Sequence, residues 1–226
     1  MNVLIKCALP LAGVLSIAGA AQAVVVPGVY NTGLGVGGSA LAAGDGQVDA
    51  NYVVVSSTNA AILPGSHALT YYNPAYLADG PLSRIVNPTG NGNGGSGEVT
   101  TFATTFSLAG FDSLTATLSG QALFDNFGEI FLNGHQVGGT ITGFGTLAPF
   151  GTNANFFNAG LNTLNFVVHN IDGPEAFQVA GLTVTAGPGA VVGGVPEPRS
   201  WAMMLAGFAM VGATMRRRKA TTIVAA

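Results

Sequence analysis

Residues 113–119 read Ser-Leu-Thr-Ala-Thr-Leu-Ser, a stretch in which apolar side chains alternate strictly with hydroxyl side chains. Successive side chains of a β-strand point to opposite faces of the sheet. Leu114, Ala116 and Leu118 would therefore line one face, and the serine and threonine hydroxyls would line the other. The stretch predicts a strand with one buried and one solvent-facing side.

Other parts of the chain repeat this period of two. Residues 98–108 and 161–169 behave in the same way, and around Gly181 the apolar phase shifts, which predicts a β-bulge. The side chains expected to point inward are Phe102, Phe106, Leu108, Leu164, Phe166, Val168, Phe177, Val179, Ala180, Leu182 and Val184.

The turn signals favour antiparallel pairing of these strands. Asn133-Gly134 lies between Ile130–Leu132 and His135–Val137, and this dipeptide suits the positive φ angles of a two-residue hairpin turn. No stretch between residues 24 and 186 keeps a helical period. Short strands, Gly-rich turns and the lack of helices predict an all-β antiparallel sandwich, with a jelly roll as the favoured version.

Composition and charge exclude several classes of protein. The chain has 226 residues, which leaves room for one substantial domain and short accessories. Between Val24 and Val195, Arg84 is the only basic residue against nine acidic ones, so this stretch has a formal net charge of −8 and would repel a phosphate backbone. We expect no nucleic-acid partner. The single cysteine, Cys7, excludes a disulfide framework or a thiolate zinc site in the body.

Residues 1–23 predict a secretory signal peptide. A basic start at Lys6, an apolar run over residues 7–20, and small residues at Ala21 and Ala23 form its three parts, with cleavage after Ala23. A buried helix or a permanent anchor is disfavoured, because the run is shorter than the roughly 20 residues that span a bilayer. We therefore expect signal peptidase and the secretion machinery as partners, and export of the body.

A second apolar segment, residues 201–215, lies near the other end and is followed by Arg216, Arg217, Arg218 and Lys219. At about 1.5 Å per residue its helix would cover about 22 Å, which predicts a short, marginal transmembrane helix. The basic cluster would stop transfer on the cytoplasmic side, with Trp201 at the outer interface. Residues 187–195 read as a Gly/Pro linker and residues 220–226 as a tail.

Pro196, Glu197 and Pro198 stand directly before this segment. The two prolines fix φ and remove two backbone donors, so the tripeptide would present an extended, accessible chain. The order Pro-Glu-Pro, apolar helix and basic cluster over residues 196–219 resembles the PEP-CTERM sorting signal of exopolysaccharide-producing Gram-negative bacteria, in the variant that continues Trp-Ala-Met-Met.

This resemblance implies recognition by exosortase, a membrane-embedded cysteine transpeptidase, while the C-terminal helix holds the chain in the inner membrane. Cleavage near the Pro-Glu-Pro tripeptide would follow, and then release or transfer of the body to the cell surface or extracellular matrix.

A second resemblance concerns the body, residues 45–186, which follows a Gly-rich N-terminal segment over residues 24–44. The stretches Ile130-Phe-Leu-Asn-Gly134 and Gly160-Leu-Asn-Thr-Leu-Asn-Phe-Val-Val168 are similar to strands of the galactose-binding-like jelly roll found in many secreted sugar-binding modules. The resemblance implies that fold. The body has no Trp, unlike many sugar binders, which puts a flat Trp platform in doubt.

Tyr71, Tyr72, Tyr76 and Arg84 are the candidates for sugar contact, because they cluster on a Pro- and Gly-rich loop. Aromatic faces stack on the C–H groups of sugars, and arginine donates hydrogen bonds to hydroxyl groups. The alternative is that the tyrosines cap the sandwich.

Asp45 and Asp49 are candidates for a structural calcium ion, since they lie in a Gly-rich turn and hard cations take oxygen ligands. The galactose-binding-like resemblance implies such an ion, and no other cofactor is expected. We expect no enzyme: the three histidines lack metal or triad spacing, and Asp125 and Glu129 suit a turn and a strand surface better than a glycosidase pair. Residues 33–38 match GxGxxG without the helix that motif needs.

Together these features predict an exported, exosortase-processed surface or matrix protein whose carbohydrate-binding-like body associates with the exopolysaccharide of a biofilm. The alternative is a structural matrix protein without a specific ligand.

Overall fold

The computed structural model describes residues 22–92, 94–189 and 198–217. The chain divides into two compact units, one ending at Gly189 and one beginning at Ala190, and each is described by itself. The predictions for residues 1–21, including Ala21, and for residues 190–197, including Pro196 and Glu197, lie outside the described residues, as do those for Arg218, Lys219 and the tail.

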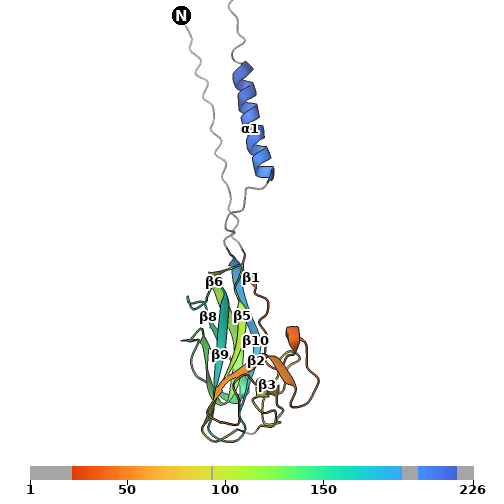
Figure 1. Cartoon of the computed structure of the whole chain (residues 1–226), viewed down its shortest axis with the longest axis vertical. Helices are drawn as coiled ribbons and strands as arrows, with labels where there is room; N and C mark the ends of the chain where they lie inside the picture. The colour runs from red at the N-terminus through yellow and green to blue at the C-terminus, as the bar shows by residue number, and fades with distance from the viewer. Residues whose placement is uncertain (1–21, 93, 190–197, 218–226) are drawn as a thin grey trace, which may run out of the picture. The chain divides into compact units, whose positions relative to one another are not determined.

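The first unit consists of antiparallel strands (Figure 1). Its only described helix is the short 3-10 turn Val36–Gly38. The strands are β1 (Val24–Val25), β2 (Val48–Ser57), β3 (His67–Thr70), β4 (Val86–Asn87), β5 (Glu98–Ser107), β6 (Phe111–Leu132), β7 (His135–Gln136), β8 (Ile141–Thr152), β9 (Leu161–Asn170) and β10 (Ala176–Pro188).

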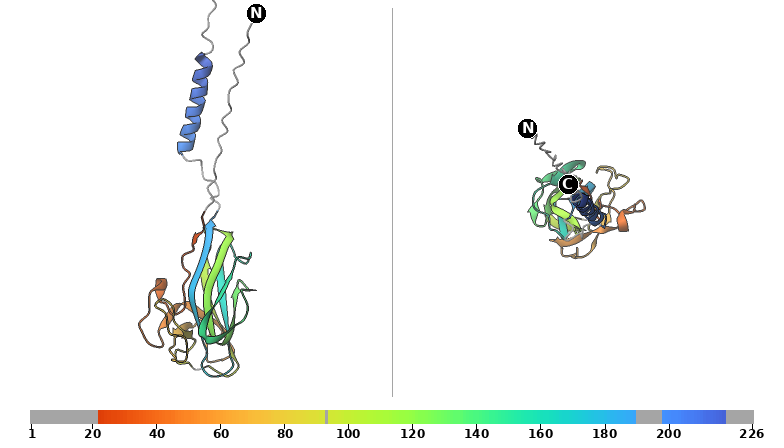
Figure 2. Two further views of the ribbon diagram at one scale, coloured as in Figure 1. Left: turned by 180° about the vertical axis from the view of Figure 1, so that it is seen from behind. Right: turned by 90° about the horizontal axis from the view of Figure 1, so that it is seen from above.

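The long strand β6 pairs with two different strands along its length. Its residues 111–125 pair with β10, whereas its residues 127–132 pair with β9. From β9 the order runs through β5, β2, β3 and β4 back to β10, so the sheet closes on itself, with β8 paired to β6 outside this ring. Figure 2 shows the long strands side by side from behind. The prediction of an all-β antiparallel, sandwich-like body is confirmed.

An aromatic cluster fills the interior of the closed sheet. The ring of Phe177 on β10 lies at the centre, with centroid distances of 4.7 Å to Phe102, 5.7 Å to Phe166, 5.9 Å to Tyr52 and 6.2 Å to Phe124. These five rings come from five different strands, and each is fully buried. Such contacts explain why strands far apart in the sequence close into one core.

Most inward positions follow the predicted alternation. The side chains expected to point inward on residues 98–108, 161–169 and 177–184 are buried, except that Ala180 is only partly buried. The register of β6 against β10 shifts between Ala180 and Thr183, as predicted. Leu114 is a correction, because it is 75% exposed while Ala116 and Leu118 are buried. It lies near the start of β6, where neither β8 nor β10 has a residue paired with it.

The Asn133-Gly134 hairpin is confirmed. β6 ends at Leu132 and β7 begins at His135, with φ angles of 50° at Asn133 and 85° at Gly134. Leu132 and His135 pair directly across the turn.

The N-terminal segment belongs to the same folded unit. Val24 pairs with Ala186, Val26 and Leu34 are buried, and the Thr32 N–H donates to the Val179 carbonyl at 3.2 Å. Residue 45 is therefore not a boundary of the folded body.

The second unit contains α1 (Pro198–Arg217), so a helix forms over the predicted apolar segment. Trp201 is half-exposed and Arg216 is exposed. Among the described residues, no helix has both the length and the apolar character needed to cross a membrane.

Candidate functional site

A pocket of about 320 Å³ opens beside the end of β3. Its lining comes from the loop before β2, from the end of β3 and from the loop that leads to β4: Ala43, Gly44, Asp45, Thr70, Tyr71, Tyr72, Asp79 and Arg84. We call it the tyrosine pocket. The structure thus brings together three of the four side chains predicted to contact sugar.

Thr70 holds the two near walls of the tyrosine pocket together. Its Oγ1 donates to the Gly44 carbonyl at 2.9 Å and accepts from the Gln47 N–H at 3.0 Å. The Gly46 N–H donates to the Thr70 carbonyl at 2.8 Å, with Gly46 at a φ of 70° that favours glycine. These bonds fix the loop carrying Asp45 against the end of β3, directly before Tyr71 and Tyr72.

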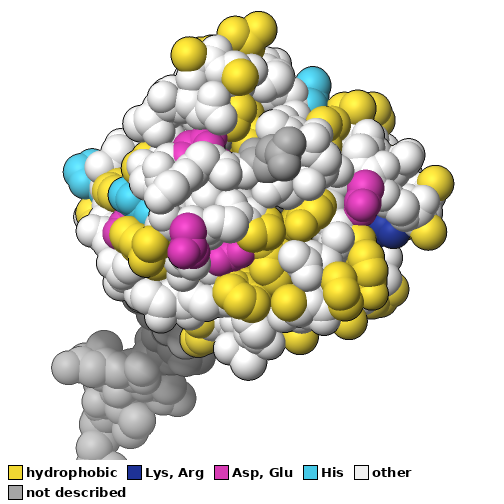
Figure 3. Space-filling view, turned by 90° about the horizontal axis from the view of Figure 1, so that it is seen from below, with side chains coloured by type: hydrophobic (Ala, Val, Ile, Leu, Met, Phe, Trp, Pro, Cys, Tyr) yellow, Lys and Arg dark blue, Asp and Glu magenta, His cyan; other side chains and the backbone are white. Residues whose placement is uncertain are grey.

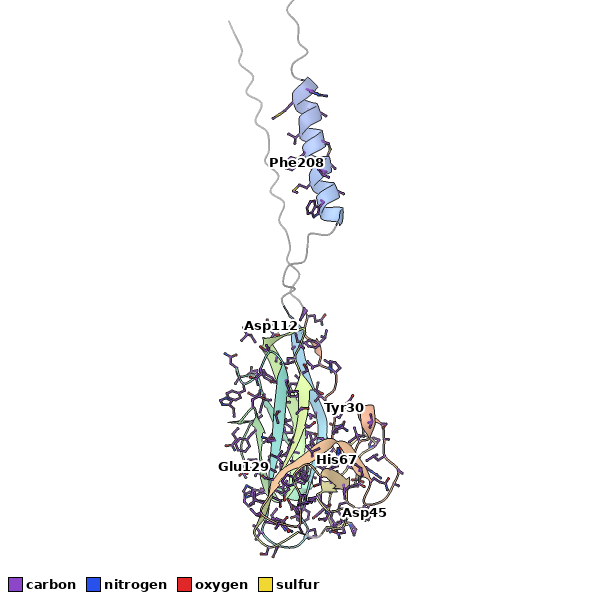
Figure 4. All side chains as sticks on the ribbon, in the orientation of Figure 1. Tyr30, Asp45, His67, Asp112, Glu129 and Phe208 are labelled. Carbon is purple, nitrogen blue, oxygen red and sulfur yellow. The ribbon has the colours of Figure 1, made fainter. Side chains whose placement is uncertain are left out.

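Asp45 and Tyr72 form one wall. The Tyr72 N–H donates to Asp45 Oδ1 at 2.6 Å, while the Tyr72 side chain is 62% exposed. Figure 4 shows Asp45 at the end of the body opposite Asp112. The wall therefore offers an aromatic ring and a carboxylate to solvent.

Arg84 and Asp79 form another part of the lining. Arg84 Nε lies 3.3 Å from Asp79 Oδ2, and Arg84 Nη1 donates to the Ala42 carbonyl at 2.5 Å. Burial raises the pKa of the Asp79 carboxyl, while the Ile85 N–H and the Arg84 charge act in the opposite direction. Figure 3, which views the body from below, shows acidic and hydrophobic side chains gathered on this face, with a basic side chain beside an acidic one.

Tyr76 lies beneath the pocket and does not line it. It is buried, its ring contacts Tyr71 and Phe144 at centroid distances of 5.9 and 4.8 Å, and its hydroxyl donates to Asp125. Burial, and then the bond to Asp125, raise the pKa of Tyr76. Tyr76 therefore follows the alternative of packing against the sandwich, and Tyr71 packs partly buried against the same cluster while it also lines the pocket.

The two aspartates proposed for calcium have separate roles. Asp49 is fully buried, and its carboxylate accepts the Gly33 N–H at 2.6 Å and the Asn51 N–H at 2.8 Å. Burial raises the pKa of Asp49 to about 6. Within the described part of the chain, no group of three or more His, Cys, Asp or Glu side chains could hold a metal ion.

The acidic and histidine side chains that the sequence did not favour as catalytic or metal-binding groups have local partners. Asp125 is buried under Tyr76, whereas Glu129 lies 2.9 Å from His169. His67 contacts the Asp49 carbonyl at 2.8 Å, and His135 stacks on Phe156 at 4.5 Å. The three histidines are thus engaged at three different places.

Two features were missed by the sequence analysis. Asp79 completes the tyrosine pocket, and its position five residues before Arg84 in the same loop was the available signal. Glu98 and Glu175 form a buried acidic pair, only 4% and 1% exposed, that no local pattern indicates.

No protein-family model matches the chain, and no curated protein is significantly similar to it. Among solved structures, it is similar to a variant of a family 29 carbohydrate-binding module in complex with mannohexaose: 15% identity, 60% of this chain and 92% of that chain covered, TM-score 0.32. A second structure, described as a family 29 carbohydrate-binding module, has 16% identity, coverages of 60% and 88%, and a TM-score of 0.30.

A third is the family 11 carbohydrate-binding module from Clostridium thermocellum in complex with a β-1,3-1,4-mixed-linked tetrasaccharide: 10% identity, coverages of 79% and 92%, TM-score 0.30. These likenesses are distant.

Proposed function

We propose that this chain is an exported, non-catalytic surface or matrix protein whose body binds a glycan in the tyrosine pocket. The observation that carries the proposal is the convergence of Tyr71, Tyr72 and Arg84 on one pocket of about 320 Å³. That volume is at the small end of the roughly 300–1,000 Å³ usual for ligand sites.

The chemistry of the pocket suits a sugar. The exposed ring of Tyr72 offers an apolar face for sugar C–H groups. Pairs of aromatic rings contribute about 0.5–1.5 kcal/mol, which sets the scale for such a contact. Carboxylates accept hydrogen bonds from hydroxyl groups, and the guanidinium group of Arg84 donates them. Donors and acceptors around an aromatic face are what a polyhydroxylated ring requires.

Two sequence resemblances support the wider proposal. The PEP-CTERM-like order over residues 196–219 supports exosortase processing and delivery to the surface or matrix of a Gram-negative biofilm. The motif that ends at Gly134 lies at the end of β6, and the Gly160 motif lies on β9, which supports a galactose-binding-like jelly roll. The glycan we propose is the exopolysaccharide that accompanies such sorting signals.

Binding of the full-length chain to purified exopolysaccharide and to neutral oligosaccharides tests the proposal. Tyr72→Ala should weaken binding about two- to thirteen-fold, on the scale of the loss of one aromatic contact. Leu114→Ala is the matched control, because Leu114 is also exposed and does not line the pocket. Absence of binding to any glycan would favour the alternative of a structural matrix protein, and binding unaffected by Tyr72→Ala would exclude this pocket.

A further inference from the structure

The tyrosine pocket contains an unbalanced negative charge. Its two carboxylates, Asp45 and Asp79, face one guanidinium group, and Arg84 pairs with Asp79 at 3.3 Å. The Asp45 carboxylate accepts only the neutral Tyr72 N–H on Oδ1, and no ion pair to Asp45 occurs within the described residues. Asp45 is close enough to raise the pKa of Asp79, so both carboxylates contribute to one local field.

The rest of the body does not offset this charge. Arg84 is the only basic side chain between residues 24 and 189, and it is already committed to Asp79 and to the Ala42 carbonyl. A surface with this excess of acid attracts cations and repels anions. Glycans that carry uronate, sulfate or phosphate groups would therefore be repelled by the pocket and by the rest of the body.

We propose that the tyrosine pocket selects amino sugars with a free ammonium group, as in a partly de-N-acetylated polysaccharide, with the ammonium group against Asp45 and the sugar ring on Tyr72. This inference rests on the glycan-binding function proposed above. An ammonium group supplies the charge that Asp45 lacks, and it can also lie over a tyrosine ring. An N-acetyl group removes that charge, and a carboxylate group reverses it.

The expected preference is modest, because Asp45 is exposed to solvent. An exposed ion pair contributes about 0.2–1 kcal/mol, so the free amine should tighten binding by up to about five-fold over its N-acetylated counterpart. Salt should reduce the preference, since exposed charges are screened.

The experiment compares a glucosamine tetrasaccharide with the N-acetylglucosamine tetrasaccharide of the same linkage. Binding to the full-length chain is measured by calorimetry at about pH 6, below the ordinary pKa of an amine and above that of an aspartate. Asp45→Asn keeps the oxygen that accepts the Tyr72 N–H and removes the charge. Asp112→Asn is the matched control, since Asp112 also accepts one backbone N–H, from Leu114 at 3.0 Å, at the opposite end of the body (Figure 4).

Tighter binding of the free amine that disappears in Asp45→Asn and persists in Asp112→Asn would support the inference. Equal binding of the two tetrasaccharides, or a preference that survives Asp45→Asn, would overturn it. These outcomes are distinguishable from failure of the proposed function. If both sugars bind equally and Tyr72→Ala weakens both, glycan binding stands and only the charge selection is wrong, whereas no binding of any sugar overturns both.

Discussion

Replacing Glu175 with Gln should remove most of the pH dependence of the free energy of unfolding between weakly acidic and weakly basic pH. Glu175 precedes β10 and is 1% exposed; its Oε2 accepts the Thr100 hydroxyl at 3.1 Å. Burial, followed by the neighbouring Glu98, raises the pKa of Glu175 from 4.5 to about 8. Its Oε1 is buried and receives no hydrogen bond from the described part of the chain, and a side-chain hydrogen bond with Glu98 also favours the protonated carboxyl group.

The sign and size follow from this shift. Below pH 4.5 the carboxyl group is protonated in both states, and between pH 4.5 and about 8 the unfolded chain loses the proton while the folded chain keeps it. The folded state then binds more protons, so stability is greatest at the acidic end and falls as pH rises. At about 1.4 kcal/mol per pH unit, the fall over this interval is about 5 kcal/mol.

Denaturant unfolding of the full-length chain at intervals from about pH 5 to 9 measures this fall. Glu175→Gln mimics the protonated acid, because its amide oxygen can accept the Thr100 hydroxyl and its NH₂ group can donate to Glu98. At pH 5 the variant should be as stable as the wild type or slightly less stable. At pH 9 it should be clearly more stable than the wild type.

Asp49, with a pKa of about 6, should leave a smaller fall at lower pH in both proteins. Asp112→Asn, which changes a carboxylate outside the core, should keep the wild-type profile. If Glu175→Gln shows the same fall between pH 6 and 8 as the wild type, the raised pKa of Glu175 is refuted.

Three further outcomes are expected. Phe177→Ala should lower the free energy of unfolding by about 3–5 kcal/mol in denaturant titrations, because it empties the centre of the aromatic cluster. The control Leu114→Ala should change it by less than about 0.5 kcal/mol, and equal effects of the two substitutions would contradict the assigned core. Gly134→Ala should cost about 1 kcal/mol in the same assay, because φ at Gly134 is 85°, and an unchanged midpoint would argue against the turn geometry. The intact mass of the protein can be measured in surface and culture-fluid fractions. The wild type should give a chain that begins at Val24 and ends near Pro198, and the variant Pro196→Ala/Glu197→Ala/Pro198→Ala should not. A chain that still ends at Ala226 in both would remove the sorting proposal.

The local features of the fold could be predicted from the sequence because they depend on near neighbours. Alternation of apolar and polar residues fixes which side chains of β5, β9 and β10 face inward, and Phe102, Phe166 and Phe177 are buried accordingly. The hairpin at Asn133-Gly134 and the bulge beside Gly181 are equally local, since each depends on the backbone freedom or the phase of a few residues.

The candidate site was only partly predictable. Tyr71, Tyr72 and Arg84 could be singled out by residue type and by the composition of their loop, and the structure places all three on one pocket. Tyr76 has the same type and lies in the same loop, yet it is buried against Phe144 and Asp125. The partners that bury it come from β8 and β6, which are distant in the sequence.

By itself the sequence determined the alternating strands β5, β9 and β10 with most of their inward faces, the hairpin and the acidic charge of the body, because each depends on residue type and short spacing. Only the tertiary structure decided that β6 pairs with β10 along one half and with β9 along the other, and that Glu98 and Glu175 meet in the interior. The physical reason is that closure of the sheet sets the register between distant strands. That register, and no local pattern, determines which polar groups share a pocket and which lose contact with water.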